Sequence, residues 1–320
     1  MKEKLDIVFF GLPDLGVEVL SGIIELKDLV DVKWLVSPGP RDENNDPLIL
    51  LAKKENIPYY ILNNIKDIYL KERLIELRPF VVIVAGFDFK ILPELLVLPS
   101  FGFINIHPSL LPEYRGGNPY FWVIANGEKE TGVTFHKMDE NFDTGPILYQ
   151  EKIEIHQRES LGTLLFRLGI LAKEMVKKLI VDLFVKRKEL EFTIQDKECT
   201  KFAPKLKDKD LILDFNKDAA VVDRLTRAAS PYYGMVTKLN GLLNVKVWET
   251  APLFENEDAK SKIPMELKPG TIKLIDNKVV IICSTSCVEL KVIQIENIFL
   301  GSGYRAYELG LIRDGDCFRL

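Results

Sequence analysis

The sequence predicts an α/β protein with a doubly wound, mostly parallel sheet, followed by a smaller C-terminal β barrel. In the first part of the chain, short apolar runs typical of buried strands alternate with amphipathic, helix-like segments. From about residue 208 the pattern changes to short alternating runs separated by the turn dipeptides NG, PG and DN. A chain of 320 residues is long enough for two domains. We therefore predict an N-terminal domain over 1–190, a linker over 191–207 and a C-terminal domain over 208–320.

The elements of the first domain follow from apolar runs and their turn residues. Five strands are predicted where short apolar runs end at Gly, Pro or polar residues: 5–11, 31–37, 58–62, 79–87 and 101–107. Helices with apolar residues three and four apart are predicted between them: 14–26, 47–57, 68–78 and 93–99. A helix over 118–128, a β pair at 131–139 and 147–155, and a long helix over 160–184 complete this domain.

The remainder of the chain has a different pattern of apolar and polar residues. Residues 186–210 lose the apolar periodicity and indicate a linker. Beyond it, alternating apolar and polar residues predict the strands of a small barrel or open sheet: 235–241, 242–251, 270–284 and 287–296. A terminal helix is predicted near 302–312.

Composition excludes several classes of protein. The net charge of -4 gives no global basic field for nucleic acid, although a local patch can exist. No apolar run reaches membrane-spanning length, and the start "MKEKLDIVFF" is too short for a signal peptide, so we expect no membrane association and a cytoplasmic protein. The four cysteines form no CxxC pair, so we expect no metal site. The turn "GLPDLG" departs from the dinucleotide-binding GxGxxG motif.

A chemical site is indicated where the fifth predicted strand ends. Asn105 and His107 are two residues apart, so an extended backbone points both side chains to one face. In doubly wound sheets this edge binds ligands. Downstream, the turn "MDENFDTGPI" supplies Asp139, Glu140 and Asp143, and a carboxylate against His107 is expected to orient the ring and raise its pKa. Taken singly, each residue also has an ordinary structural explanation. Together they suit acyl transfer to an amine of the substrate.

These residues belong to a longer pattern that resembles the 10-formyltetrahydrofolate-dependent formyltransferase family. The motifs that carry the resemblance are Asn105-x-His107, "SLLP" at 109–112, "YRG" at 114–116, "TGVT" at 131–134 and "MDxxxDTG" at 138–145. "ILP" at 91–93 is similar to the folate-side loop of the family. The C-terminal segments "RAASPYYG", "VKVW" and "PGTI" resemble the barrel of members that formylate methionyl-tRNA. The resemblance implies a Rossmann-like catalytic domain and an OB-like barrel.

The resemblance also implies roles for individual residues. Asn105 and His107 would polarise the formyl oxygen, and Asp143 would pair with His107 and help to take the proton from the amine. The folate would be bound by a rigid wall at Ser109, Leu110, Leu111 and Pro112, together with the backbone around Phe87, Ile91 and Leu92. Asp139 is a further expected folate contact. Leu12 and Arg115 would contact the acceptor, although Arg115 is equally explained as a residue that braces its own turn.

The amine acceptor stays open at this stage. Methionyl-initiator-tRNA is the first choice, because the resemblance spans nearly the whole chain. The alternative is an amino-deoxysugar nucleotide, because "SPGPRDENNDP" at 37–47 is short and acidic where tRNA enzymes of the family carry a basic loop. "RGGNPY" and Leu12 also depart from the pattern of those enzymes. A folate-binding protein without catalysis and a formyl-folate hydrolase are two further hypotheses. His136 is interpreted as a hydrogen-bonded strand residue more readily than as a site residue.

Overall fold

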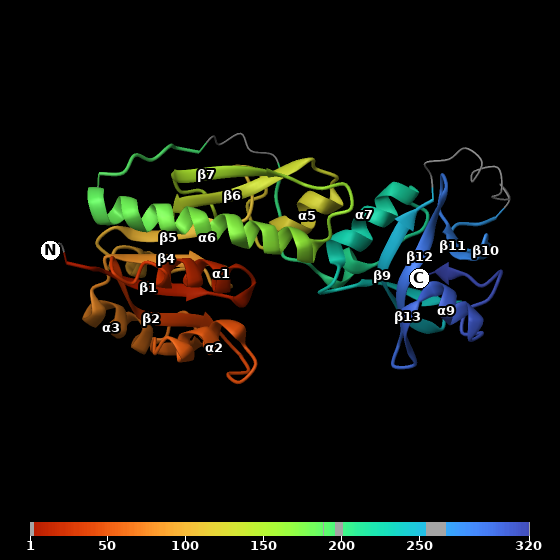
Figure 1. The fold of residues 1–320 in the computed structure, drawn as a ribbon, viewed down its shortest axis with the longest axis horizontal. Helices are drawn as coiled ribbons and strands as arrows, with labels where there is room; N and C mark the ends of the chain where they lie inside the picture. Colours follow the sequence, from red (N-terminus) through yellow and green to blue (C-terminus); the bar gives the residue numbers. More distant parts are fainter. Residues whose placement is uncertain (1–2, 188, 196–200, 254–266, 320) are drawn as a thin grey trace. The chain divides into compact units, whose positions relative to one another are not determined.

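A computed structural model describes residues 3–187, 189–195, 201–253 and 267–319. The chain divides into two compact units, which are described separately (Figure 1). Unit 1 contains residues 1–119, 130–154 and 165–204. Unit 2 contains residues 120–129, 155–164 and 205–320. The division into domains remains a proposal, and residues up to 204 group with unit 1 although the sequence pattern favoured a linker there.

The core of unit 1 is a seven-stranded sheet with the order β3-β2-β1-β4-β5-β6-β7. The first five strands in chain order are parallel, and β6 and β7 run antiparallel to their neighbours. The strands are β1 (Leu5–Gly11), β2 (Val30–Pro38), β3 (Tyr59–Leu62), β4 (Val81–Ala85), β5 (Gly102–His107), β6 (Glu130–Lys137) and β7 (Ile147–Glu154). Because β1, β4 and β5 are neighbours, their carboxyl ends meet at one edge of the sheet.

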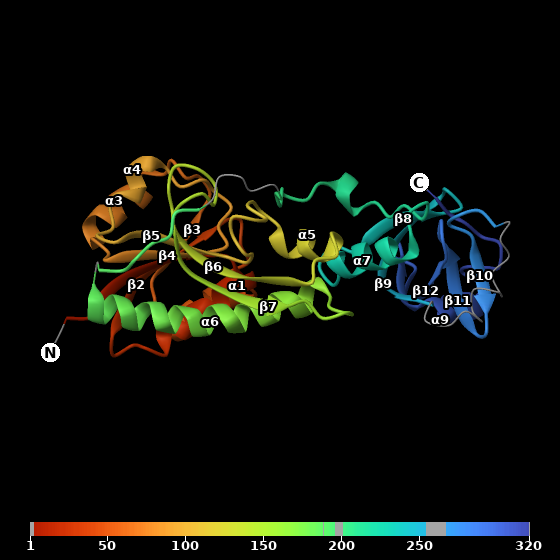
Figure 2. The same cartoon turned by 90° about the horizontal axis from the view of Figure 1, so that it is seen from above.

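Helices cover both faces of this sheet (Figure 2). The helices are α1 (Pro13–Ile24), α2 (Pro47–Lys54), α3 (Ile68–Leu77), α4 (Pro93–Leu96) and α6 (Leu161–Lys186). On one face, α3 and α4 bury leucines against alternate strand residues such as Val8 and Val82. On the other, Gly16 of α1 lies against Leu48 of α2, and Gly22 of α1 allows α6 to approach closely. The strand residues therefore pack on both faces, which explains their nearly continuous apolar runs.

Unit 2 is built on an antiparallel sheet with the order β10-β11-β12-β9-β8-β14, and β13 also pairs with β12. Its strands are β8 (Met235–Leu239), β9 (Leu243–Pro252), β10 (Ile272–Ile275), β11 (Lys278–Ile282), β12 (Cys287–Ile295), β13 (Phe299–Ser302) and β14 (Phe318–Arg319). A bridge between Thr271 and Cys317 connects the two ends of this strand order. The sheet therefore closes into a small barrel, as the sequence predicts.

The remaining helices belong mainly to unit 2. They are α5 (Pro119–Ala125), α7 (Ala219–Ala229), α9 (Gly303–Glu308) and the 3-10 helix η1 (Asp208–Leu211). The sequence prediction missed α7, although Asp218 caps it by accepting a hydrogen bond from the N–H of Ala220. Among the residues that the structure describes, no helix is long and apolar enough to cross a membrane.

Candidate active site

Asn105 and His107 lie on one face of β5, at the carboxyl edge of the sheet. The antiparallel register of β5 and β6 places His136 directly opposite Asn105 and Thr134 opposite His107. His107 and His136 are buried, with 4% and 1% of their surface exposed. Two buried imidazoles therefore flank the Asn105 amide, and strand geometry alone brings the three side chains together.

The third predicted residue, Asp143, reaches this cluster from the turn between β6 and β7. Its backbone has a φ of +56°, in the left-handed region that Asp tolerates better than most residues. Gly145 makes the turn possible, because a Cβ atom there would lie 1.7 Å from the carbonyl oxygen of Lys137. Asp139 accepts hydrogen bonds from the Thr144 hydroxyl and from the N–H of Asn141. Asp139 thus braces the turn and Asp143 points into the cluster.

The carboxylate of Asp143 connects four groups. Its Oδ1 atom accepts a hydrogen bond of 3.2 Å from Asn105 Nδ2 and lies 3.6 Å from His107 Nδ1 and 3.5 Å from His136 Nε2. Its Oδ2 atom accepts a hydrogen bond of 2.9 Å from the N–H of Gly116. Burial raises the pKa of Asp143, but the positive charge that His107 carries when it is protonated, the His136 ring and the Gly116 N–H together hold it well below its usual range. Asp143 is therefore ionised at neutral pH.

The protonation of His107 follows from its partners. Nε2 lies 2.9 Å from the carbonyl oxygen of Tyr114, which only accepts, so Nε2 donates its proton there. Burial lowers the pKa of His107, and the nearby Asp143 and the Tyr114 carbonyl, which raise it, do not compensate. The expectation of a raised pKa was wrong, because desolvation of the ring outweighs the carboxylate. His107 is thus a neutral imidazole whose free Nδ1 faces Asp143.

His136 is a hydrogen-bonded strand residue, as the sequence indicates, and it also lies against Asn105 and Asp143. Its Nδ1 lies 3.2 Å from the carbonyl oxygen of Lys137, so Nδ1 donates and Nε2 is left as an acceptor. Asn105 Nδ2 lies 3.1 Å from this Nε2 atom. The amide of Asn105 is therefore held with its N–H groups toward His136 and Asp143. Position was the available signal, because His136 and Thr134 are two residues apart and share one face of the strand beside Asn105.

The segment after His107 forms a rigid wall. The Thr134 hydroxyl donates to the carbonyl oxygen of Ser109 and accepts from the N–H of Leu111. Gln150 Nε2 donates to the carbonyl oxygen of Leu111 and to Thr134 Oγ1. The Ser109 hydroxyl donates to the carbonyl oxygen of Glu113. Ser109 and Leu111 therefore face the interior, while Leu110 and Pro112 stay partly exposed.

The other predicted contact residues lie on neighbouring loops. Ile91 is buried in the core between the sheet, α3 and α4, so its side chain faces away from solvent. Phe87 and Leu92 are partly exposed against the same core, and the Phe87 ring lies 5.0 Å from the ring of Phe10. Leu12 begins α1 and donates its N–H to the carbonyl oxygen of Ala85. These positions share the carboxyl edge of the sheet with His107.

Arg115 is tied to a residue that the sequence prediction missed. Its Nε and Nη2 atoms donate to Gln195 Oε1 at 3.2 and 2.7 Å. Gln195 lies in the segment predicted as a linker and is only 5% exposed. No periodic pattern marked it, because it stands among charged residues in a segment without strand or helix alternation. The structure thus ties Arg115 to Gln195, and a contact with the acceptor stays a prediction.

The acidic loop after β2 has mostly local partners. Asp42 accepts hydrogen bonds from the N–H of Asn44 and from Asn45 Nδ2. Asp46 caps α2 by accepting from the N–H groups of Leu48 and Ile49. Glu43 accepts a hydrogen bond from the Tyr59 hydroxyl. These acidic residues therefore build the loop and the start of α2.

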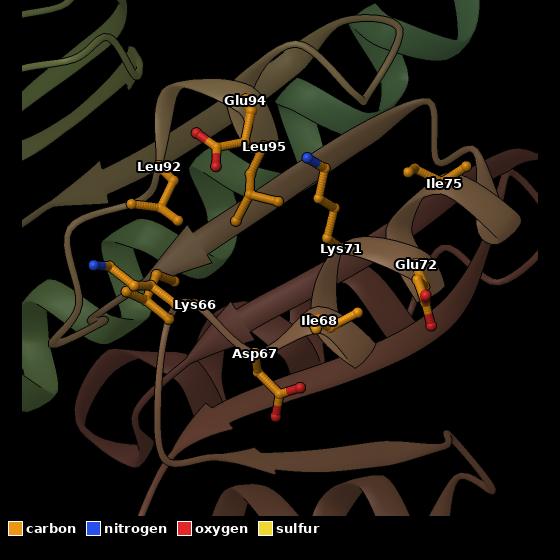
Figure 3. A pocket seen from close by; sticks show the side chains of 10 residues that line it. Lys66, Asp67, Ile68, Lys71, Glu72, Ile75, Leu92, Glu94 and Leu95 are labelled. Atoms are coloured by element: carbon orange, nitrogen blue, oxygen red, sulfur yellow. The ribbon is translucent and has the colours of Figure 1, made fainter.

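A groove of about 540 Å³ lies between α3 and α4 in unit 1, and Leu92, one of the predicted folate contacts, is on its lining (Figure 3). Its lining combines exposed apolar residues with charges of both signs, and it contains none of Asn105, His107 and Asp143. Ile68 on its wall is 72% exposed. We do not assign the groove to the reaction.

A doubly wound sheet that carries an Asn–His–Asp cluster at its carboxyl edge defines a group-transfer enzyme. The chain belongs to the formyl transferase family. The family model "Formyl transferase" matches residues 38–180, and "Formyl transferase, C-terminal domain" matches residues 205–298.

Curated relatives extend this match over most of the chain. A methionyl-tRNA formyltransferase from Thermotoga maritima is 36% identical, with 85% of this chain and 84% of the relative covered. One from Kosmotoga olearia is 32% identical, with 97% and 98% covered. Among solved structures, an N-formyltransferase from Helicobacter canadensis has a TM-score of 0.66 at 18% identity, with 93% of this chain and 99% of that one covered. This last likeness concerns the fold.

Proposed function

We propose that this protein transfers the formyl group of 10-formyltetrahydrofolate to the amino group of methionyl-initiator-tRNA, in the cytoplasm. The observation that carries the proposal is the contact of Asp143 with Asn105, His107 and His136 at the carboxyl edge of the sheet. Membership of the formyl transferase family supports formyl chemistry, and we place this chemistry at the cluster. The acceptor follows from relatives that match the chain over almost its whole length.

The residues at this edge fit a folate co-substrate. Phe87, Leu92 and Pro112 offer partly exposed apolar side chains, and the hydrogen bonds of Thr134 and Gln150 make the wall rigid. A flat heterocycle needs such an apolar slot with backbone groups at its margin. The co-substrate would supply a formyl group bound to nitrogen. The residues of the protein would orient this group, bind its oxygen and accept the proton.

Asn105 is the proposed donor to the formyl oxygen. Its N–H groups already point toward the cluster, held by Asp143 and His136 at 3.2 and 3.1 Å. These bonds lie at the long end of the usual range, so an incoming oxygen can share the same donors at little cost. A preoriented amide stabilises the negative charge that develops on this oxygen during attack.

His107 and Asp143 are the proposed proton acceptors. The amine nitrogen forms a bond to the formyl carbon and loses a proton, and the carbon–nitrogen bond to the folate breaks. The free Nδ1 of His107 lies 3.6 Å from a carboxylate, so a proton placed between them turns a repulsive contact into an ion pair. The pair then returns this proton to the leaving nitrogen, and both groups regain their starting states.

The acidic residues of the loop at 37–47 have a structural explanation that does not depend on the acceptor. The sequence pattern suggested that residues 37–47 would repel phosphates. Asp42, Glu43 and Asp46 are committed to local hydrogen bonds, so the loop is shaped by these acids, and no role in acceptor binding is needed to explain them. An amino-deoxysugar nucleotide remains the second candidate, since the fold also matches an N-formyltransferase solved with dTDP-3-aminofucose.

One assay separates the candidates. Purified protein receives 10-formyltetrahydrofolate and either methionyl-tRNA or a dTDP-3-amino sugar, and the formylated product is measured. We expect formylation of methionyl-tRNA, and its loss in His107→Ala. Formylation of the sugar alone would overturn the proposed acceptor. Formate release at the same rate without any acceptor would indicate a hydrolase.

A further inference from the structure

A buried glutamine outside the Asn–His–Asp cluster connects the two turns that hold Asp143. Gln195 lies nine residues after the end of α6 and is 5% exposed. Its Nε2 atom donates to the carbonyl oxygens of Asp143 and Gly145 at 2.9 and 2.7 Å. Its Oε1 atom accepts from the Arg115 guanidinium. Both donor hydrogens and the acceptor oxygen of this amide are therefore used.

The hydrogen bonds of Gln195 reach both residues beside the contact between Asp143 and Gly116. Asp143 Oδ2 accepts a hydrogen bond from the N–H of Gly116, the residue that follows Arg115. Gln195 thus connects the backbone of Asp143 to the side chain of Arg115. The distance between the two turns is therefore fixed both by Gln195 and by the bond from Gly116 to Asp143. The left-handed φ of Asp143, +56°, is held by the same bond to its carbonyl oxygen.

We propose that Gln195 is a positioning residue for formyl transfer, which fixes the Asp143 carboxylate between His107 and Gly116. The inference rests on the proposed function of this site and adds a residue that acts through Asp143. A displacement of the carboxylate by about 1 Å is enough to lower the rate of a positioned reaction by about 100-fold.

The backbone around Gln195 is anchored independently of its side chain. Thr193 and Ile147 exchange two N–H···O bonds of 2.7 and 2.8 Å. Farther along, Ala203 donates its N–H to the carbonyl oxygen of Arg115, and Tyr114 donates to that of Lys201. A substitution of Gln195 therefore removes the amide and leaves these backbone bonds of Thr193, Lys201 and Ala203 in place.

Two variants separate the chemistry of the amide from its volume. Gln195→Met keeps the length of the side chain and removes the donor and the acceptor. Gln195→Glu keeps an acceptor for Arg115 and places a carboxylate against two carbonyl oxygens. The matched control is Gln294→Met, because Gln294 also uses both ends of its amide, with Trp248 Nε1 and the carbonyl oxygen of Glu296, but lies in unit 2.

The test measures kcat and KM for formyl transfer in the full-length proteins, together with the pKa of His107 by NMR. With only three histidines in the chain, His107 can be assigned. We expect kcat to fall about 10- to 100-fold in both variants with KM for the amine acceptor nearly unchanged. We also expect a lower His107 pKa, since a displaced Asp143 no longer raises it.

Results that contradict the role of Gln195 can be distinguished from a failure of the proposed function. Wild-type kcat and an unchanged His107 pKa in Gln195→Met would overturn the inference, as would a loss of thermal stability with full kcat. If the wild-type protein formylates neither acceptor, the proposed function fails. The His107 titration then still decides whether Gln195 positions Asp143, because it needs no turnover.

Discussion

Asn105 on β5 and His136 on β6 form a cross-strand pair, and their side chains meet with Asn105 Nδ2 3.1 Å from His136 Nε2. His136 donates its other ring proton to the carbonyl oxygen of Lys137, which fixes Nε2 as an acceptor. The tautomer of one residue therefore sets the orientation of the amide that is proposed to bind the formyl oxygen.

Replacement of His136 tests this orientation. His136→Leu leaves the Asn105 amide without this acceptor, so we expect kcat to fall about 10-fold while the protein remains folded. His136→Gln offers a carbonyl oxygen in a similar place and should recover most of the rate. Steady-state assays with methionyl-tRNA measure both variants. Equal rates in the leucine variant and the wild type would show that Asn105 needs no help from His136.

His107 and Asp143 are expected to act as one unit. His107→Ala and Asp143→Asn should each lower kcat by about 10² to 10⁴, because each removes half of the proton acceptor. The double variant should lose little more than either single variant, as in other catalytic groups that work together. Single-turnover measurements and circular dichroism separate chemistry from folding. Multiplicative losses in the double variant would contradict a shared proton.

The titration of His107 has a predictable sign. Burial lowers its pKa, so the imidazole of the folded protein becomes protonated only below pH 6.5, the ordinary midpoint. Between pH 6.5 and the lowered pKa of the folded state, the unfolded chain binds more protons than the folded protein. The contribution of His107 to the free energy of unfolding therefore falls as the pH falls. NMR should give a His107 midpoint below 6.5, the ordinary value of an imidazole. Asp143→Asn should lower it further, because the carboxylate raises it; an upward shift would contradict this account.

The sequence predicted most of this architecture, and the failures have physical reasons. The parallel strands of unit 1 could be predicted because each is a short apolar run bounded by turn residues. Helix α7 was missed because strand-like runs follow it, although its cap, Asp218, was visible. Period-two geometry placed Asn105 beside His107, but the choice of Asp143 among three acids depends on a left-handed φ that the pattern does not encode. Gln195 acts through contacts across about fifty residues, which no local rule predicts.

Gly145 should be a strict requirement of the turn. A Cβ atom in Gly145→Ala would lie 1.7 Å from a backbone oxygen, so the turn must move, and we expect a loss of roughly 3 kcal/mol or more in the free energy of unfolding. Gly169→Ala in α6 is the control, since its Cβ would meet only the flexible side chain of Glu18. Gly169→Ala should change the stability by less than about 1 kcal/mol, because the gain in helix propensity is offset by a small shift of Glu18. Denaturant unfolding measures both, and similar stabilities would contradict the tight turn.

The salt dependence of KM distinguishes the two acceptors without any variant. A tRNA acceptor is bound partly through phosphates, and each neutralised phosphate releases counterions, so KM rises steeply with salt. With about four phosphate contacts, an increase from about 50 to 200 mM KCl should raise KM for methionyl-tRNA by about 100-fold. A sugar nucleotide carries only two phosphates and should show a change of a few-fold, and KM for the folate serves as the internal control. If KM for methionyl-tRNA does not change over this range, the protein does not recognise the tRNA backbone. The amino-sugar reaction then becomes the better assignment, because the net charge of -4 supplies no other attraction for a polyanion.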